Sequence, residues 1–201
     1  KDVKKTLENG SNLLVHAPTG MGKTIATLGP ALKYAIDNNK TVFFLTSRHT
    51  QHLLAVKTLK DIKDKFNLKI NCCDIIGKKW MCLQPNAEKM NSNEFGEYCK
   101  ALKEDGLCSY FNGLKNKGLP SEKFKSTFIK LEELMPADTE TINQISKNSK
   151  LCPYEMAVSL AKESNVVIAD YNYIFNDNIR ENFFVRTEKN LENSILIIDE
   201  G

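Results

Sequence analysis

Short apolar runs alternate with stretches of helical periodicity at both ends of the chain. The runs have the length of buried strands and occupy residues 12–17, 41–46, 69–76, 165–169 and 194–198. Between them, apolar residues recur every three or four positions over residues 23–36, 51–66 and 154–163, which predicts amphipathic helices. Because strands and helices alternate, we expect an α/β domain with a parallel sheet.

The middle of the chain breaks this alternation. Over residues 77–153 the apolar periodicity weakens, Asn, Lys, Glu and Ser dominate, and four of the six cysteines occur. We therefore predict that residues 77–153 are an insertion in a domain formed by residues 1–76 and 154–201. The insertion has too few regularly spaced apolar residues to support a core of its own.

Composition narrows the class of protein only slightly. The 201 residues are 41% apolar and 26% charged, with a formal net charge of +3, as in an ordinary globular protein. No apolar run approaches the roughly 20 residues of a membrane span, and the first residues do not resemble a signal peptide. We expect a monomer in the cytoplasm. Disulfides are not expected there, so metal binding or burial remains for the cysteines.

A glycine loop lies between the first predicted strand and its helix. The sequence APTGMGKT offers flexible backbone at Gly20 and Gly22, a cation at Lys23 and a hydroxyl at Thr24. Converging backbone N–H groups, a helix N-terminus and a lysine bind phosphates, and the hydroxyl binds Mg²⁺. The predicted ATP-binding residues are Ala17, Pro18, Thr19, Gly20, Met21, Gly22, Lys23 and Thr24.

An acidic pair follows the last predicted strand. We expect Asp199 to hold Mg²⁺ together with Thr24, and Glu200 to activate the attacking water. Lys23, Asp199 and Glu200 are thus the predicted catalytic residues. A small residue before P-T-G-x-G-K-T, combined with the D-E pair, resembles the first RecA-like motor domain of superfamily 2 helicases.

Four cysteines in the insertion are candidates for a metal site. Cys82, Cys99, Cys108 and Cys152 are dispersed and form no C-x₂-C pair. Four thiolates of this kind suit an iron–sulfur cluster, a zinc ion or plain burial, and spacing alone does not choose among them. Cys72 and Cys73 lie on a predicted strand, and we expect them to be core residues.

Short sequence motifs around these cysteines resemble those of one known family. KKWMC, which ends at Cys82, and CPYE, which begins at Cys152, resemble the two ends of the iron–sulfur domain in the XPD family of DNA helicases. That family also includes DinG-like enzymes, and this sequence most resembles its archaeal members. The resemblance implies a small, mainly helical domain in which Cys82, Cys99, Cys108 and Cys152 hold a [4Fe–4S] cluster.

Polar residues after the second predicted strand are candidates for contact with DNA. LTSRHTQH resembles motif Ia of the family. Residues at strand ends and helix starts commonly supply contacts to nucleic-acid phosphates. By contrast, we expect His16 to be a satisfied core histidine. The predicted DNA-binding residues are Ser47, Arg48, Thr50, Gln51, His52, Lys78 and Lys79.

The resemblance implies an ATP-dependent DNA helicase that moves 5′ to 3′ on single-stranded DNA, opens duplex junctions and acts in DNA repair. We expect this chain alone to lack unwinding activity, because such motors need a second motor domain. Two alternatives are a P-loop kinase and a non-catalytic nucleotide-binding module, each with a zinc-binding insertion.

Overall fold

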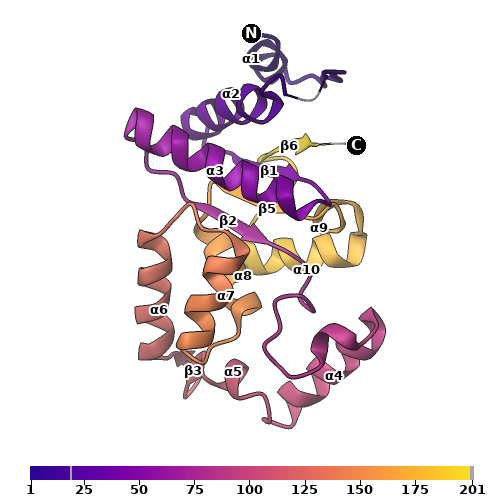
Figure 1. Ribbon diagram of the computed structural model, residues 1–201, viewed down its shortest axis with the longest axis vertical. Helices are drawn as coiled ribbons and strands as arrows, with labels where there is room; N and C mark the ends of the chain where they lie inside the picture. Colours follow the sequence, from indigo (N-terminus) through magenta and orange to yellow (C-terminus); the bar gives the residue numbers. More distant parts are fainter. Residues whose placement is uncertain (19, 200–201) are drawn as a thin grey trace.

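The computed structural model describes residues 1–18 and 20–199, and a four-stranded parallel sheet lies at its centre (Figure 1). The strands follow the order β2-β5-β1-β6. They are β1 (Thr41–Leu45), β2 (Cys72–Ile75), β5 (Val166–Ala169) and β6 (Ser194–Ile198). Parallel pairing confirms the predicted α/β class with a parallel sheet and four of the five predicted strands.

Helices cover the sheet and build the insertion. Those in or next to the sheet domain are α1 (Asp2–Glu8), α2 (Lys23–Asp37), α3 (His49–Phe66), α8 (Pro153–Glu163), α9 (Asn172–Phe175) and α10 (Asp177–Thr187). Those of the insertion are the 3₁₀ turn η1 (Ala87–Lys89), α4 (Ser92–Glu104), α5 (Ser109–Asn112), α6 (Glu122–Glu133) and α7 (Thr139–Asn148). A small hairpin joins β3 (Lys115–Asn116) to β4 (Leu119–Pro120).

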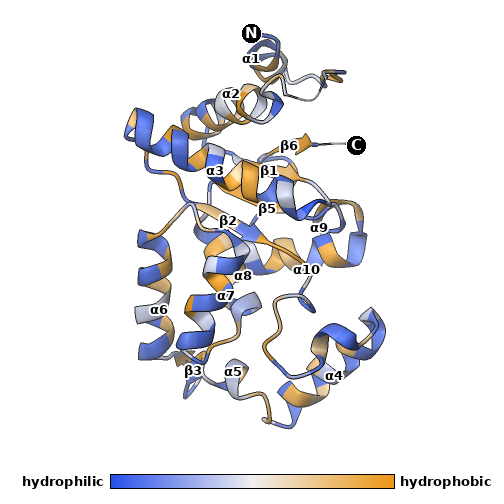
Figure 2. Cartoon of the chain, in the orientation of Figure 1, coloured by the Kyte–Doolittle hydropathy of each residue, from blue (hydrophilic) through white to orange (hydrophobic). Residues whose placement is uncertain are grey.

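Each face of the sheet has its own apolar core, because side chains alternate along a strand. Val42 and Phe44 of β1 pack with residues of α2 and α3 on one face. Phe43 and Leu45 pack with residues of α8 and α10 on the other. The strands are accordingly hydrophobic in composition (Figure 2). Both faces are covered, as expected for a parallel sheet.

The insertion consists of two unlike parts. Helices α6 and α7 pack near α8 and β2, and their Leu131 and Ile142 belong to the core under the sheet. Residues 77–121, which we call the cysteine lobe, carry η1, α4, α5 and the hairpin. This lobe lies at the end of the molecule opposite α1 (Figure 1). The insertion therefore shares the sheet's core through α6 and α7 and extends away from it through the cysteine lobe.

The predicted strand at residues 12–17 is wrong. These residues have no regular structure, and Leu14 is 99% exposed. A strand needs a neighbour to satisfy its backbone groups, and within the described residues this segment pairs with none. His16 is exposed with the rest of the segment, so its prediction as a core histidine is also wrong.

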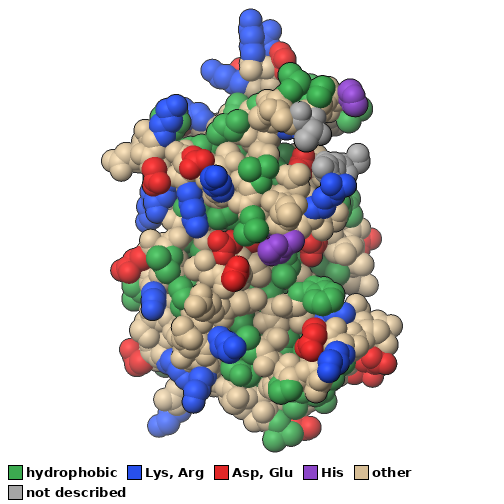
Figure 3. All heavy atoms as spheres, viewed as in Figure 1, with side chains coloured by type: hydrophobic (Ala, Val, Ile, Leu, Met, Phe, Trp, Pro, Cys, Tyr) green, Lys and Arg blue, Asp and Glu red, His purple; other side chains and the backbone are tan. Residues whose placement is uncertain are grey.

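Charges are spread over the surface. In Figure 3, Lys and Arg side chains lie among acidic and apolar ones across the visible face and do not form one stripe. Among the described residues, no helix is both long enough and apolar enough to cross a membrane.

Candidate nucleotide and metal sites

The glycine loop leads directly into the N-terminus of α2. Gly20 has φ of 88°, and Gly22, which caps the helix, has φ of 70° and ψ of 33°. Glycine reaches these left-handed conformations without a steric penalty, whereas residues with a Cβ rarely do. Among the described residues, no side chain caps α2, so its first N–H groups are available to an anion.

Lys23 folds back over this loop. Its Nζ atom donates to the backbone oxygen of Ala17 at 3.3 Å, which holds the ammonium group beside the glycines. Thr24 follows as the second residue of α2, and Pro18 and Met21 are exposed on the loop. Thr19 lies outside the described residues.

The carboxyl ends of three neighbouring strands meet at one edge of the sheet. The backbone N–H of Asp199 donates to Leu45 at 2.9 Å, and that of Thr46 donates to Ala169 at 3.1 Å. Helix α2, which follows the glycine loop, packs against β1 and against β6, the strand that immediately precedes Asp199. Ligand sites in open α/β sheets form at such carboxyl ends. Glu200 lies outside the described residues.

The segment predicted to contact DNA divides into a surface part and a buried residue. Ser47, Arg48 and Thr50 are exposed where β1 passes into α3, and Gln51 is half-buried. His52 is only 1% exposed and is enclosed by carboxylates, so the structure does not present its side chain to a ligand. The candidates that remain accessible are therefore Ser47, Arg48, Thr50 and, in part, Gln51.

Lys78 and Lys79 are half-buried at the edge of the cysteine lobe. Lys79 donates to the backbone oxygen of Met90 at 3.0 Å and lies 4.2 Å from the centre of the Trp80 ring. Lys78 lines the pocket that holds the cysteines, with its Nζ atom 5.8 Å from the centre of the Tyr154 ring. Both lysines thus have contacts within the protein itself.

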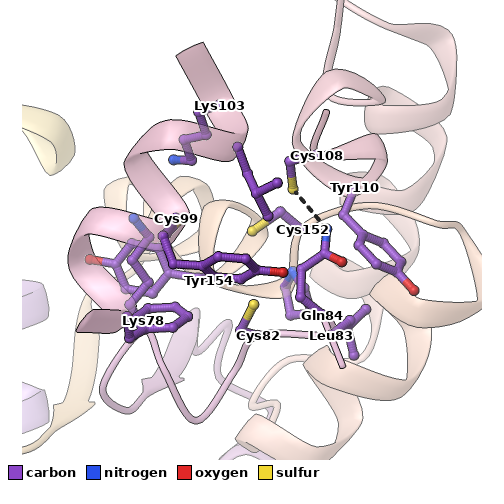
Figure 4. A pocket seen from close by; sticks show the side chains of 14 residues that line it. Lys78, Cys82, Leu83, Gln84, Cys99, Lys103, Cys108, Tyr110, Cys152 and Tyr154 are labelled. Carbon is purple, nitrogen blue, oxygen red and sulfur yellow. Dashed lines mark hydrogen bonds between the residues drawn. The ribbon is translucent and has the colours of Figure 1, made fainter. Parts of the chain in front are cut away.

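All four predicted ligand cysteines line one pocket (Figure 4). Cys82 comes from the loop after β2, Cys99 from α4, Cys108 from the start of α5 and Cys152 from the start of α8. The volume of this pocket is about 20 Å³. The fold therefore brings together cysteines as far apart in sequence as Cys82 and Cys152. Cys72 and Cys73, in contrast, are fully buried in the two cores of the sheet, as predicted.

Burial disfavours the thiolate form of two of these cysteines, Cys82 and Cys152. It raises the pKa of Cys152 to about 12 and raises the pKa of Cys82 above its usual range. The side-chain N–H of Gln84 donates to the sulfur of Cys108 at 3.5 Å. Within residues 1–18 and 20–199, no three His, Cys, Asp or Glu side chains are arranged to hold a metal ion.

A partly buried ionic cluster, which sequence reasoning missed, joins the cysteine pocket to the sheet domain. Glu155 accepts from Lys103 at 2.7 Å and from Arg186 at 2.5 Å, so α8 links α4 with α10. Although burial opposes ionisation of Glu155, the two cations lower its pKa. Lys103 itself lines the pocket. The residues are far apart in sequence, and only the fold reveals the pairing.

Comparison with known proteins agrees with this arrangement. The DEAD_2 family matches residues 44–201. The general transcription and DNA repair factor IIH helicase subunit XPD/RAD3 of Saccharomyces cerevisiae is 24% identical over 226 residues, covering 100% of this chain and 27% of the yeast protein. A regulator of telomere elongation helicase 1 homolog of Arabidopsis thaliana is 25% identical, covering 99% of this chain and 21% of the plant protein.

Solved structures show the same fold. One named XPD_Helicase has a TM-score of 0.63 and 24% identity, covering 99% of this chain and 30% of its own. Another, named Truncated XPD, has a TM-score of 0.62 and 24% identity, covering 99% of this chain and 50% of its own. The chain spans about a quarter of the length of the curated relatives it matches. With more than half of its residues matched, the chain belongs to the DEAD_2 family and is similar to helicases of the XPD type.

Proposed function

We propose that this chain forms the ATP-binding part of an ATP-dependent DNA helicase of the XPD type. The observation that carries the proposal is Lys23, held over a glycine loop at the uncapped N-terminus of α2, in a chain of the DEAD_2 family. The same membership favours this function over a small-molecule kinase or a non-catalytic module.

Each group of the nucleotide site has a chemical role in this proposal. The N–H groups of the loop and the ammonium group of Lys23 bind the β- and γ-phosphates and stabilise the charge that develops on them. Thr24 and Asp199 would hold the Mg²⁺ ion, and Glu200 orients and deprotonates the attacking water. When bound, the ion would supply positive charge that offsets the charge of the phosphates.

We further propose that Cys82, Cys99, Cys108 and Cys152 hold a [4Fe–4S] cluster. Thiolates are soft ligands that suit such clusters, and all four cysteines line one pocket. Four dispersed cysteines without a C-x₂-C pair suit a zinc ion as well as a cluster, and the resemblance to the XPD family favours the cluster. When bound, the cluster would tie together the segments that carry the four cysteines.

The proposed track for single-stranded DNA runs over the start of α3. Ser47, Arg48, Thr50 and Gln51 offer hydroxyl, guanidinium and amide groups to backbone phosphates. Lys78 and Lys79 add positive charge near the cysteine lobe. By resemblance to the family, we propose 5′-to-3′ movement, opening of duplex junctions and a role in DNA repair, with no unwinding by this chain alone.

The proposal is tested by ATP hydrolysis in the full-length protein, with and without single-stranded DNA. Lys23→Ala should lower the DNA-stimulated rate by about 100-fold or more, because it removes the cation that faces the transferred phosphate. Lys33→Ala is the matched control, since Lys33 also lies on α2 but is 74% exposed and pairs with Asp37. Hydrolysis by Lys23→Ala at the wild-type rate, or a wild type indifferent to DNA, would contradict the proposal.

A further inference from the structure

His52 occupies a buried position between two strand ends. Its Nδ1 atom lies 2.5 Å from a carboxylate oxygen of Asp74 on β2, and its Nε2 atom lies 3.1 Å from the backbone oxygen of Thr46 after β1. A carboxylate oxygen of Asp170, which follows β5, is 3.7 Å from Nε2. The start of α3 is thereby attached to the ends of three strands.

Both ring nitrogens of His52 face acceptors, so both must carry a proton. Burial alone opposes this charge, but contacts with Asp170, Asp74 and Thr46 outweigh it and raise the pKa of His52 to about 10. An imidazolium between two carboxylates resists separation from them, because separation leaves charges unpaired in a buried site, so the three groups move together.

The residue after Asp170 faces a different site. The Tyr171 hydroxyl donates to the backbone oxygen of Asp199, the residue that we place on Mg²⁺. Asp170 and Tyr171 are neighbours in sequence, so one short turn contacts both the base of α3 and the end of β6. On the far side of His52, the other carboxylate oxygen of Asp74 accepts from the N–H of Thr139 at 3.0 Å and from its hydroxyl at 2.8 Å.

We propose that the turn Asp170–Tyr171 couples the DNA-contacting start of α3 to Asp199 in the nucleotide site. The inference deepens the proposed function and rests on it. His52 lies in the first turn of α3, directly after the exposed candidates Thr50 and Gln51. A phosphate that pulls on these residues moves the imidazolium, which carries Asp170 with it. Because Tyr171 shares a peptide bond with Asp170, the carbonyl group of Asp199 shifts in turn.

Asp170 and Tyr171 are positioning residues in this scheme, so their replacement should affect stimulation and leave basal chemistry intact. Asp170→Asn keeps the shape of the side chain and removes the charge that faces His52. In the full-length protein we expect hydrolysis without DNA, and the affinity for single-stranded DNA, to stay within about twofold of wild type. Stimulation of ATP hydrolysis by DNA should fall by about fivefold or more, the usual size of a coupling between sites.

Asp177→Asn is the matched control, because Asp177 is 78% exposed in the same region and pairs with Arg180 one turn further along α10. Tyr171→Phe removes just the hydroxyl that reaches Asp199, and it carries the test if Asp170→Asn does not fold. If both residues act on one path, the double variant should lose no more stimulation than whichever single variant is more impaired. A purely structural role would instead lower thermal stability and basal hydrolysis together.

The outcomes separate this inference from the proposed function. A wild type that DNA stimulates, with Asp170→Asn and Tyr171→Phe stimulated equally, overturns the coupling and leaves the helicase proposal standing. Additive losses in the double variant also overturn it, since they indicate two independent effects. A wild type that DNA does not stimulate overturns both.

Discussion

The sheet domain and the cysteine lobe are held together by different forces. Every residue of β1, β2 and β5 except Thr41 is buried, and cores cover both faces of the sheet. In the cysteine lobe, the buried apolar side chains are few: Met81, Ala87, Phe95, Cys108 and Leu114. Apolar burial of about 25 cal/mol per Å² stabilises the first region, and little of it is available to the second. We therefore predict that the lobe depends on a metal group held by its Cys82, Cys99 and Cys108 together with Cys152 at the start of α8.

The largest expected effect is the loss of a pocket cysteine. Cys99→Ser should reduce iron and acid-labile sulfide in anaerobically purified protein to near zero, because an alcohol oxygen is a poor replacement for a thiolate on iron. Cys72→Ala is the control: Cys72 is fully buried under α2 and α3, away from the pocket, and its loss should leave the cluster's absorbance unchanged. Stoichiometric zinc without sulfide in wild type would sink the cluster assignment.

The next effect falls on the sheet. Phe43 is fully buried in β1, with its ring centre 5.8 Å from that of Phe184 and 6.5 Å from that of Phe183. Phe43→Ala should lower the free energy of unfolding by about 3–5 kcal/mol in denaturant titrations, since it leaves a cavity. Val185→Ala, at a side chain that is 81% exposed, should change it by no more than about 0.5 kcal/mol. Equal effects of the two variants would show that this core does not hold the sheet.

The smallest effect concerns the pH dependence of the buried polar network around His52 in the sheet domain. Folding raises the pKa of His52 from its ordinary 6.5 to about 10, so the stability it contributes is complete below pH 6.5 and is lost as pH rises through 10. The groups that face it are Asp74 and Asp170. Between pH 7 and 10, the melting temperature of wild type should fall more steeply than that of His52→Gln. Parallel slopes would mean that His52 is already neutral.

The local pattern of apolar residues predicted most of the helices and strands of the sheet domain. Four strands and the helices α2, α3 and α8 follow from apolar periodicity, which reports burial directly. The same reasoning failed at residues 12–17, because an apolar run forms a strand only where a neighbouring strand accepts its hydrogen bonds. It also could not foresee that Leu131 and Ile142 of the insertion would join the sheet's core.

The candidate sites also divide into those with a local sequence signal and those without one. Local sequence motifs predicted the glycine loop and the four cysteines, and the structure brings all four cysteines to one pocket. His52 was predicted to contact DNA because it lies in a polar segment of the sequence. In the structure it is buried against Asp74 and Asp170, which are remote from it in sequence. Pairings between distant residues carry no sequence signal of their own, and the Glu155 cluster was missed for the same reason.

Hydrogen exchange, measured on the full-length protein with its iron and again after anaerobic chelation of that iron, tests the comparison most directly. We predict that amides of α4 and α5 lose about 100-fold or more of their protection when iron is removed, because little apolar burial remains to hold them. Amides of β1 and β5 should keep their protection. If α4 and α5 stay protected in fully iron-free protein, or if β1 and β5 lose protection to the same extent, the account of two separately stabilised regions is contradicted.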